Sequence, residues 1–143
     1  MPEKLKIKQR EHLLVLLQEE QEQAGHISGQ FIEQIAQAMD LSISEVYGVA
    51  TFYHFLSTRP LGRNVIHVCK CIPCYLKNSQ LVVETIQEKL GIAPGETTQD
   101  GRFSLQLTNC IGACDQAPAM LLNHDLHGYL TSDKIAQILE ACP

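Results

Sequence analysis

Four cysteines form two short-spaced pairs that lie far apart in the sequence. Cys69 and Cys74 are separated by four residues, and Cys110 and Cys114 by three. Each pair follows a run of residues typical of a β-strand, where the backbone can curl around a ligand. Two such pairs can bring four thiolates to one centre. The sequence therefore predicts a metal site formed by these four thiols.

The spacing alone leaves the kind of centre open. Structural zinc takes C-x₂₋₄-C pairs, and the two pairs lie near the edge of that range. A [2Fe–2S] cluster also takes four cysteine thiolates. A third interpretation is a thiol–disulfide site, because Cys71-Ile-Pro-Cys74 is a C-x-x-C motif at a strand end near a helix start. A helix N-terminus there would lower a thiol pKa. That interpretation leaves the other site cysteines unexplained.

The composition is that of a globular chain about one domain long. The 143 residues are 45% hydrophobic and carry a formal net charge of −5, without a basic patch that would indicate nucleic-acid binding. No apolar run reaches the ~18 residues of a membrane span, and the run Leu13–Leu17 is too short for a signal peptide. We therefore expect a cytoplasmic protein without membrane insertion, in which paired cysteines indicate metal or redox chemistry.

Residues 1 to about 58 are predicted to be helical. The first helix has leucines in the i, i+3, i+4 spacing of a buried stripe and Gly25 as its expected C-terminal cap. These leucines are Leu13, Leu16 and Leu17, with Leu14 beside them. Ser28 is the expected N-cap of a second helix. The apolar face of that helix consists of Phe31 or Ile32, Ile35, Ala36 and Met39.

A third helix is predicted to begin at a capping box formed by Ser42 and Glu45. Its expected buried stripe consists of Val46, Val49, Ala50 and Tyr53. Phe52 and Phe55 lie off this stripe, which indicates a second contact surface. The stretch Thr58–Gly62 contains Pro60 and is the expected linker. We therefore expect a three-helix region over residues 1–60.

Residues 61–143 are predicted to form a small α/β domain. The expected elements are a strand at Val65–Val68, a helix at Ser79–Leu90 capped by Gly91, strands at Phe103–Leu107 and Ala119–Leu122, a hairpin turn at Asn123–Gly128 leading into Tyr129 and Leu130, and a helix from Thr131. The order strand, helix, strand, strand, helix suggests a thioredoxin-like α/β sandwich.

Further segments accompany the two cysteine stretches at fixed places along the chain. They are Val49-Ala-Thr-Phe-Tyr53, Gly95-Glu-Thr-Thr98, Asp100-Gly-Arg-Phe103, and Ala117-Pro118 with Asn123 downstream. Together these motifs closely resemble the 24 kDa-type subunit of respiratory NADH dehydrogenase and the related small subunits of NAD(P)-linked hydrogenases and formate dehydrogenases. The resemblance runs from about residue 10 to the C-terminus, and pair spacing, order and intervening segments all agree.

The resemblance implies a helical N-terminal part followed by a thioredoxin-like domain with a small mixed sheet. It implies one [2Fe–2S] cluster, with Cys69, Cys74, Cys110 and Cys114 as ligands by position. It also implies a flavoprotein partner that carries FMN and the NAD(P)H site, and a further catalytic subunit with iron–sulfur clusters. The chain itself shows no G-x-G-x-x-G phosphate loop and no pairing of a nucleophile with a base. We therefore expect electron transfer, with no complete active site in this chain.

Three residues depart from the family pattern. Cys71 is an extra thiol where a small or hydroxyl residue is usual, and it is a possible substitute ligand. Asn78 replaces a usual Gly, and Asn tolerates the left-handed conformation. Asn109 stands where an acidic residue is common, so the cluster is expected to have a less negative potential. Cys142 and the six histidines are expected to have no role at the site.

Overall fold

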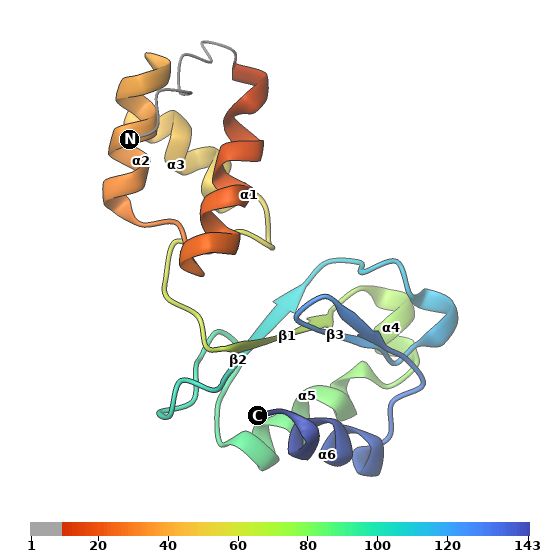
Figure 1. Cartoon of the computed structure of the whole chain (residues 1–143). Coiled ribbons are helices and arrows are strands. Elements are labelled where there is room, and N and C mark those ends of the chain that lie inside the picture. Colours follow the sequence, from red (N-terminus) through yellow and green to blue (C-terminus); the bar gives the residue numbers. More distant parts are fainter. Residues whose placement is uncertain (1–9) are drawn as a thin grey trace. The chain divides into compact units, whose positions relative to one another are not determined.

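The structure, a computed structural model, describes residues 10–143 (Figure 1). Its elements are η1 (Arg10–His12), α1 (Leu13–Ala24), α2 (Gly29–Met39), α3 (Ile43–Phe52), β1 (Asn64–Cys69), α4 (Ile72–Leu76), α5 (Ser79–Leu90), β2 (Phe103–Thr108), η2 (Cys114–Gln116), β3 (Met120–Leu122), β4 (Asp125–His127) and α6 (Ser132–Ala141). They divide into two compact units, with the boundary between Pro60 and Leu61. Each unit is described by itself.

The first unit is a bundle of the three helices α1, α2 and α3 (Figure 1). Its core contains the predicted stripes, and its fully buried side chains include Leu17, Ile35, Val46 and Ala50. The predicted caps are also present. Gly25 ends α1 with a left-handed φ of 78°, and the hydroxyls of Ser28 and Ser42 accept hydrogen bonds from Phe31 N–H and Glu45 N–H.

The side chain of Tyr53 departs from the predicted stripe of α3. The helix ends at Phe52, and Tyr53 follows with extended backbone and a side chain that is exposed. A segment beyond the last helical turn cannot keep the helical spacing, so Tyr53 leaves the buried face. Phe52 and Phe55, predicted to lie off the stripe, are indeed exposed.

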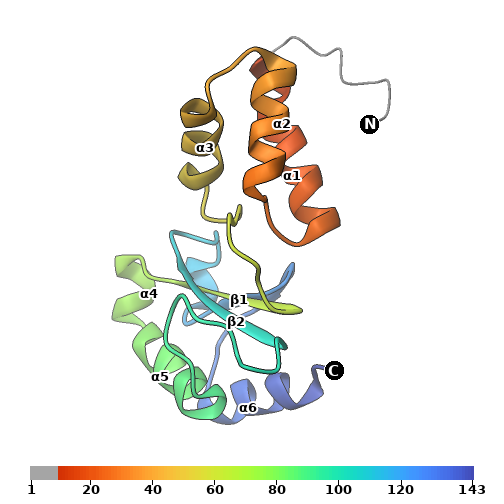
Figure 2. The same cartoon turned by 90° about the vertical axis from the view of Figure 1, so that its left-hand side faces the viewer.

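The second unit contains a four-stranded mixed sheet in the order β2-β1-β3-β4. β1 is parallel to β2 and antiparallel to β3, and β3 is antiparallel to β4. α5 and α6 lie side by side against one face of the sheet (Figures 1 and 2). This confirms the predicted thioredoxin-like α/β class with a mixed sheet.

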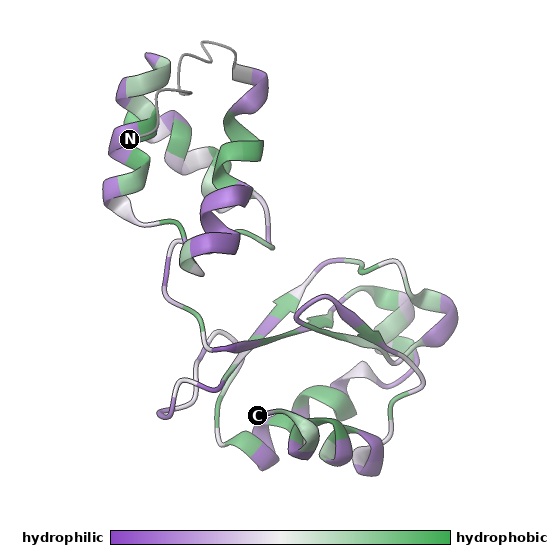
Figure 3. Ribbon diagram, in the orientation of Figure 1, coloured by the Kyte–Doolittle hydropathy of each residue, from purple (hydrophilic) through white to green (hydrophobic). Residues whose placement is uncertain are grey.

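The core of this unit lies between the sheet and the two helices. Its side chains come from alternate strand positions and from the apolar faces of α5 and α6, which are coloured as hydrophobic in Figure 3. Among those that are fully buried are Ile66, Val68, Ile86, Leu105, Met120 and Ile135. The α5 bounds and the Gly91 cap agree with the prediction.

Three elements of this unit were not predicted: α4, β4 and the short 3-10 helix η2. α4 is a five-residue helix with Cys71 at its N-cap and Pro73 in its first turn, whereas the sequence predicts only a helix start near this point. β4 occupies Asp125–His127, within the stretch assigned to a turn, so the hairpin is tighter than predicted. Tyr129 does not continue a strand, because its φ is 49°.

Gly62 is required where the chain enters the sheet. A Cβ atom at this position would lie 2.9 Å from the carbonyl carbon of Phe103, closer than real Cβ contacts, and 3.0 Å from its nitrogen. The Gly62 N–H donates to the Ser104 hydroxyl at 2.7 Å. Close backbone approach at this point sets the start of β1 beside the start of β2.

Candidate metal centre

Strand register brings the two cysteine stretches together. β1 and β2 are parallel, and Cys69 is the register partner of Thr108. The Lys70 N–H continues this pairing by donating to the Thr108 carbonyl at 2.9 Å. Because both strands run in the same direction, their carboxyl ends share one edge of the sheet. Cys110 therefore begins its loop beside the end of the strand that carries Cys69.

Cys69 and Cys74 form the covered half of the site. Both are buried, at 1% exposure each. α4 places Cys74 in this position, since Cys71 caps the helix and its carbonyl accepts from Tyr75 N–H at 3.0 Å. This short helix turns the chain back toward the strand end.

Cys110 and Cys114 form the open half of the site. Both are exposed, and their sulfur atoms are 3.7 Å apart. The Gly112 N–H donates to Cys110 Sγ at 3.3 Å, within a turn that Gly112 makes with a φ of 77°. A tetrahedral metal with sulfur ligands at about 2.3 Å places two of them about 3.8 Å apart. This pair therefore has the separation of two ligands on one metal.

Residues later in the chain hold the segment after Cys114 in place through hydrogen bonds. The Tyr129 N–H donates to the Gln116 carbonyl at 2.7 Å, and the Leu130 N–H donates to the Pro118 carbonyl at 3.0 Å. Lys134 Nζ, on α6, donates to the Gly128 carbonyl at 2.6 Å. These hydrogen bonds hold the loop of Cys114 in place, although no sequence pattern indicates this role for residues 128–130.

The thiols influence one another electrostatically. Burial raises the pKa of Cys69, but hydrogen bonds from the Cys71 backbone and from the thiols of Cys74 and Cys71 outweigh it, so the pKa of Cys69 is lowered. Burial, the hydrogen bond with Cys69 and the charges of the neighbouring thiolates raise the pKa of Cys74 to about 12. The hydrogen bond with Cys110 raises the pKa of Cys114. The four side chains thus form one interacting group.

A nucleophilic dithiol requires a lowered thiol pKa. Burial and the hydrogen bond with Cys69 raise the pKa of Cys71, and the pKa of Cys74 is raised as well. The raised pKa values of both thiols therefore disfavour the thiol–disulfide interpretation.

The arrangement of the thiols also bears on zinc. Within residues 10–143, no three His, Cys, Asp or Glu side chains converge on a point that would hold a single ion. Cys110 and Cys114 approach each other as a pair, with their sulfur atoms 3.7 Å apart. A binuclear cluster takes two thiolates at each iron, so the donor set fits a [2Fe–2S] group.

The comparison with known families decides between the possible kinds of centre. Residues 2–143 match the family described as thioredoxin-like [2Fe-2S] ferredoxin. This chain belongs to that family. The family assignment covers nearly the whole chain, and it confirms the predicted fold class and the predicted [2Fe–2S] cofactor.

Individual relatives are similar along most of the chain. The E subunit of the NADH-quinone oxidoreductase of Pseudomonas aeruginosa is 42% identical over 121 residues, which are 85% of this chain and 73% of that protein. The corresponding protein of Escherichia coli K12 is 40% identical over 120 residues, which are 84% of this chain and 72% of that protein. These similarities confirm the predicted resemblance to NADH dehydrogenase subunits.

A solved structure shows the same fold. A chain of an NAD⁺-reducing [NiFe]-hydrogenase in the air-oxidized state superposes with a TM-score of 0.78 at 26% identity. The match covers 94% of this chain and 23% of the hydrogenase chain, so the present ferredoxin spans about a quarter of that larger chain. The predicted resemblance to hydrogenase subunits is thereby confirmed.

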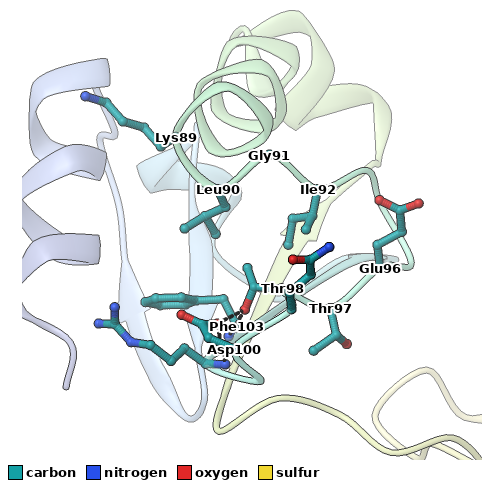
Figure 4. A pocket seen from close by; sticks show the side chains of 11 residues that line it. Lys89, Leu90, Gly91, Ile92, Glu96, Thr97, Thr98, Asp100 and Phe103 are labelled. Carbon is teal, nitrogen blue, oxygen red and sulfur yellow. Dashed lines mark hydrogen bonds between the residues drawn. The ribbon is translucent and has the colours of Figure 1, made fainter.

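A hollow at the opposite end of β2 does not belong to the cysteine site. It is lined by Lys89–Ile92 at the end of α5 and by the loop that leads into Phe103, including Thr98, Asp100 and Arg102 (Figure 4). Phe103 begins β2, whereas Cys110 follows the other end of that strand. The side chains in this hollow stabilise the loop through the hydrogen bonds of Asp100.

We expect Thr98→Val to raise the pKa of Asp100. The Thr98 hydroxyl and the Arg102 N–H both donate to Asp100 Oδ1, and these bonds lower the pKa of the carboxyl. A lowered native pKa stabilises the fold above the unfolded value of 3.8, and this effect disappears as the pH falls through the native pKa. An NMR titration of the carboxyl checks the shift. Thr97→Val is the matched control, because the Thr97 hydroxyl pairs with Ser104.

Proposed function

We propose that this chain is the electron-transfer subunit of a multisubunit NAD(P)H-linked oxidoreductase of the NADH dehydrogenase, hydrogenase or formate dehydrogenase type. It holds one [2Fe–2S] cluster on Cys69, Cys74, Cys110 and Cys114. The observation that carries this proposal is the parallel pairing of β1 with β2, which places both thiol pairs at one sheet edge in a member of a [2Fe–2S] family. When bound, the cluster takes up and releases one electron at a time.

The two pairs of proposed ligands have different roles at the site. Cys69 and Cys74, buried at the end of β1 and in α4, shield one side from water. Cys110 and Cys114 are exposed and form the side that a partner can approach. An electron carrier needs one protected side for a stable cluster and one accessible side for exchange with a partner, and the site has both.

We further propose that the exchange partner is a flavoprotein subunit that carries FMN and the NAD(P)H site, in a complex that also has a catalytic subunit with iron–sulfur clusters. The similarity to subunits of NADH-quinone oxidoreductases and to part of an NAD⁺-reducing hydrogenase supports this. We place the protein in the cytoplasm, where thiols stay reduced. No helix within residues 10–143 has the length and apolarity to cross a membrane.

The test is an anaerobic visible and EPR spectrum of the purified chain, with iron and sulfide counts, before and after dithionite. We expect about two irons and two sulfides per chain, and a paramagnetic signal on reduction. A colourless protein that binds one zinc would contradict the electron-transfer proposal and support a zinc-stabilised binding module.

The exposed apolar side chains of α3, which lie on more than one side of the helix, are our candidate for the surface that binds the flavoprotein. While Val46 and Ala50 face the core, Ile43, Tyr47 and Phe52 are exposed, Phe52 at 73%. Exposed large apolar side chains that gather on one helix favour a protein contact. Deletion of residues 1–58 is then expected to abolish co-purification with the flavoprotein and to leave the cluster in place.

A finer variant tests the same surface without removing the bundle. Tyr47→Ser with Phe52→Ser is expected to weaken binding of the flavoprotein by roughly tenfold or more, since aromatic side chains at an interface often contribute over 1 kcal/mol each. Binding is measured by quantitative pull-down from the assembled complex. Val15→Ser, an exposed apolar residue on α1, is the matched control. Unchanged binding in the double variant and the deletion would move the contact to the second unit.

Asn109→Glu is expected to lower the midpoint potential of the cluster. Asn109 is exposed and directly precedes Cys110. A negative charge there disfavours the reduced, more negative cluster, and a nearby unit charge at the surface contributes about 1 kcal/mol, or a few tens of millivolts. A redox titration followed by EPR checks the shift. Asn109→Gln keeps the side chain neutral and should leave the potential in place. Equal potentials for the Glu and Gln variants would contradict the electrostatic account.

A further inference from the structure

The turn that carries Cys114 has little packing of its own. η2 is a single three-residue turn, closed by the Gln116 N–H donating to the Ala113 carbonyl at 3.0 Å, and none of its residues is buried. A segment without buried side chains is positioned by the contacts that other segments make with it. The contacts after Cys114 come from residues 128–134.

Gly128 lies directly against Gln116. A Cβ atom at position 128 would lie 2.6 Å from both Cβ and Oε1 of Gln116, and 3.2 Å from its carbonyl oxygen. Cβ atoms do not approach side-chain atoms this closely, and Gly128 itself is buried. Only glycine therefore allows the backbone at position 128 to contact a residue two places after Cys114.

Tyr129 has an unfavourable backbone conformation that makes the same contact. Its φ is 49°, in the left-handed region that bulky side chains rarely adopt. Its side chain is 65% exposed, so packing of the ring does not explain the conformation. Such a conformation persists only where surrounding contacts fix it. Here the Tyr129 N–H donates to the Gln116 carbonyl at 2.7 Å.

Lys134 joins this segment to the core of the second unit. Its Nζ donates to the Gly128 carbonyl at 2.6 Å. Lys134 lies on α6, and the next residue, Ile135, is fully buried in the core. The contact with Gln116 is therefore connected to a helix that is fixed by packing.

We propose that Gly128 and Lys134 are positioning residues for the cluster, which hold Cys114 in place through Gln116. This inference rests on the proposed cluster site. Neither residue supplies a ligand. Gly128 leaves room for Gln116, and Lys134 keeps the Gly128 backbone against it. Retention of iron by the exposed pair, Cys110 and Cys114, then depends on a segment that contains no ligand.

The test uses full-chain variants reconstituted anaerobically with iron and sulfide. Iron and sulfide counts, the EPR spectrum after dithionite and the rate of iron loss to an added chelator are measured for each. Wild type is expected to bind about two irons and two sulfides. Gly128→Ala is expected to lose iron faster by roughly tenfold or more, because the added Cβ displaces Gln116 and with it Cys114. Its EPR spectrum is expected to differ from that of wild type.

Gly101→Ala is the matched control. Gly101 has a φ of 69°, so alanine is strained there, but an added Cβ would meet nothing within 4 Å. Thermal unfolding followed by far-UV circular dichroism is expected to show a lower midpoint for both glycine variants. Only Gly128→Ala is expected to change the EPR spectrum and the rate of iron loss. This comparison separates positioning of Cys114 from a general loss of stability.

A compensating substitution tests the contact itself. Gln116→Gly removes both Cβ and Oε1, the two atoms that an alanine at position 128 would meet at 2.6 Å. The double variant, Gly128→Ala with Gln116→Gly, is therefore expected to lose iron at nearly the rate of Gln116→Gly alone. This non-additive result is the signature of two residues in direct contact.

Lys134→Met tests the second positioning residue, and it keeps the inference testable if Gly128→Ala does not fold. Methionine has a similar length but no donor, so iron loss is expected to be faster by about threefold. Lys134→Arg keeps a donor and is expected to restore the rate of wild type. Lys89→Met, at the end of α5, controls for removal of a surface charge.

The outcomes separate this inference from the proposed function. An unchanged rate of iron loss in Gly128→Ala, an equal effect in Gly101→Ala, or fast loss that persists in the double variant would overturn the role of Gly128. A rate in Lys134→Met equal to that of wild type would overturn the role of Lys134. Each of these results leaves the electron-transfer proposal standing, provided that wild type is fully loaded. Failure of wild type to bind iron would overturn both proposals.

Discussion

Replacement of Cys114 by Ala is expected to leave the chain folded and to remove most of its iron. Cys114 is exposed, at the start of the short η2 turn, and no hydrophobic core depends on its side chain. Its sulfur lies 3.7 Å from that of Cys110, so its loss leaves one iron with a single ligand from this loop. Iron and sulfide counts, the visible spectrum and the EPR signal after dithionite measure the loss.

Cys142→Ala is the control for the Cys114 variant. Cys142 follows α6, and its Sγ donates to the Ile138 carbonyl within that last helical turn. Its loss is expected to leave the iron content unchanged. Full iron content in the Cys114 variant would contradict the proposed ligand set and require another donor from the open half of the site.

The sequence alone was sufficient to predict the elements whose boundaries are set by residues close together in the chain. Ser28 and Ser42 cap helices through their own hydroxyls, and Gly25 and Gly91 end helices in the left-handed conformation, so residue type alone predicted these boundaries. The helix predicted at roughly Ser79–Leu90 agrees with α5, and the Gly91 cap marks its end. The alternation in Phe103–Leu107 likewise indicated the strand β2, because it records burial on one face.

Elements that depend on their neighbours were not predictable in this way. β4 has no alternating apolar pattern, since its side chains are mostly exposed at the sheet edge, and its pairing with β3 defines it. α4 is shorter than two turns and leaves no periodic pattern of its own. The contacts of Tyr129 and Leu130 with the loop of Cys114 join backbone groups, which carry no signal in residue type.

The candidate site likewise has features that the sequence predicts and features that only the folded chain shows. Spacing identified the four thiols, but it left zinc, iron–sulfur and dithiol chemistry open. The parallel register of Cys69 with Thr108 and the buried and exposed halves of the site are properties of the folded sheet.

Ile66→Ala and Leu17→Ala are expected to destabilise different parts of the chain. Each side chain is fully buried, Ile66 in the core of the second unit and Leu17 in that of the first. Truncation of a buried Ile or Leu to Ala costs about 2–5 kcal/mol, a large share of the roughly 5–15 kcal/mol that stabilises a typical domain. Because the two cores share no residue, each variant should weaken one unit.

Thermal unfolding of the loaded protein distinguishes the two effects. The visible absorbance of the cluster reports on the second unit, and the far-UV signal reports on the helices of both. Ile66→Ala is expected to lower the temperature at which the cluster is lost, since β1 carries Cys69 directly after this core. Leu17→Ala should lower the helical transition and leave the temperature of cluster loss unchanged. An equal decrease in both variants would contradict the proposed domains at 1–60 and 61–143 and indicate a single cooperative unit.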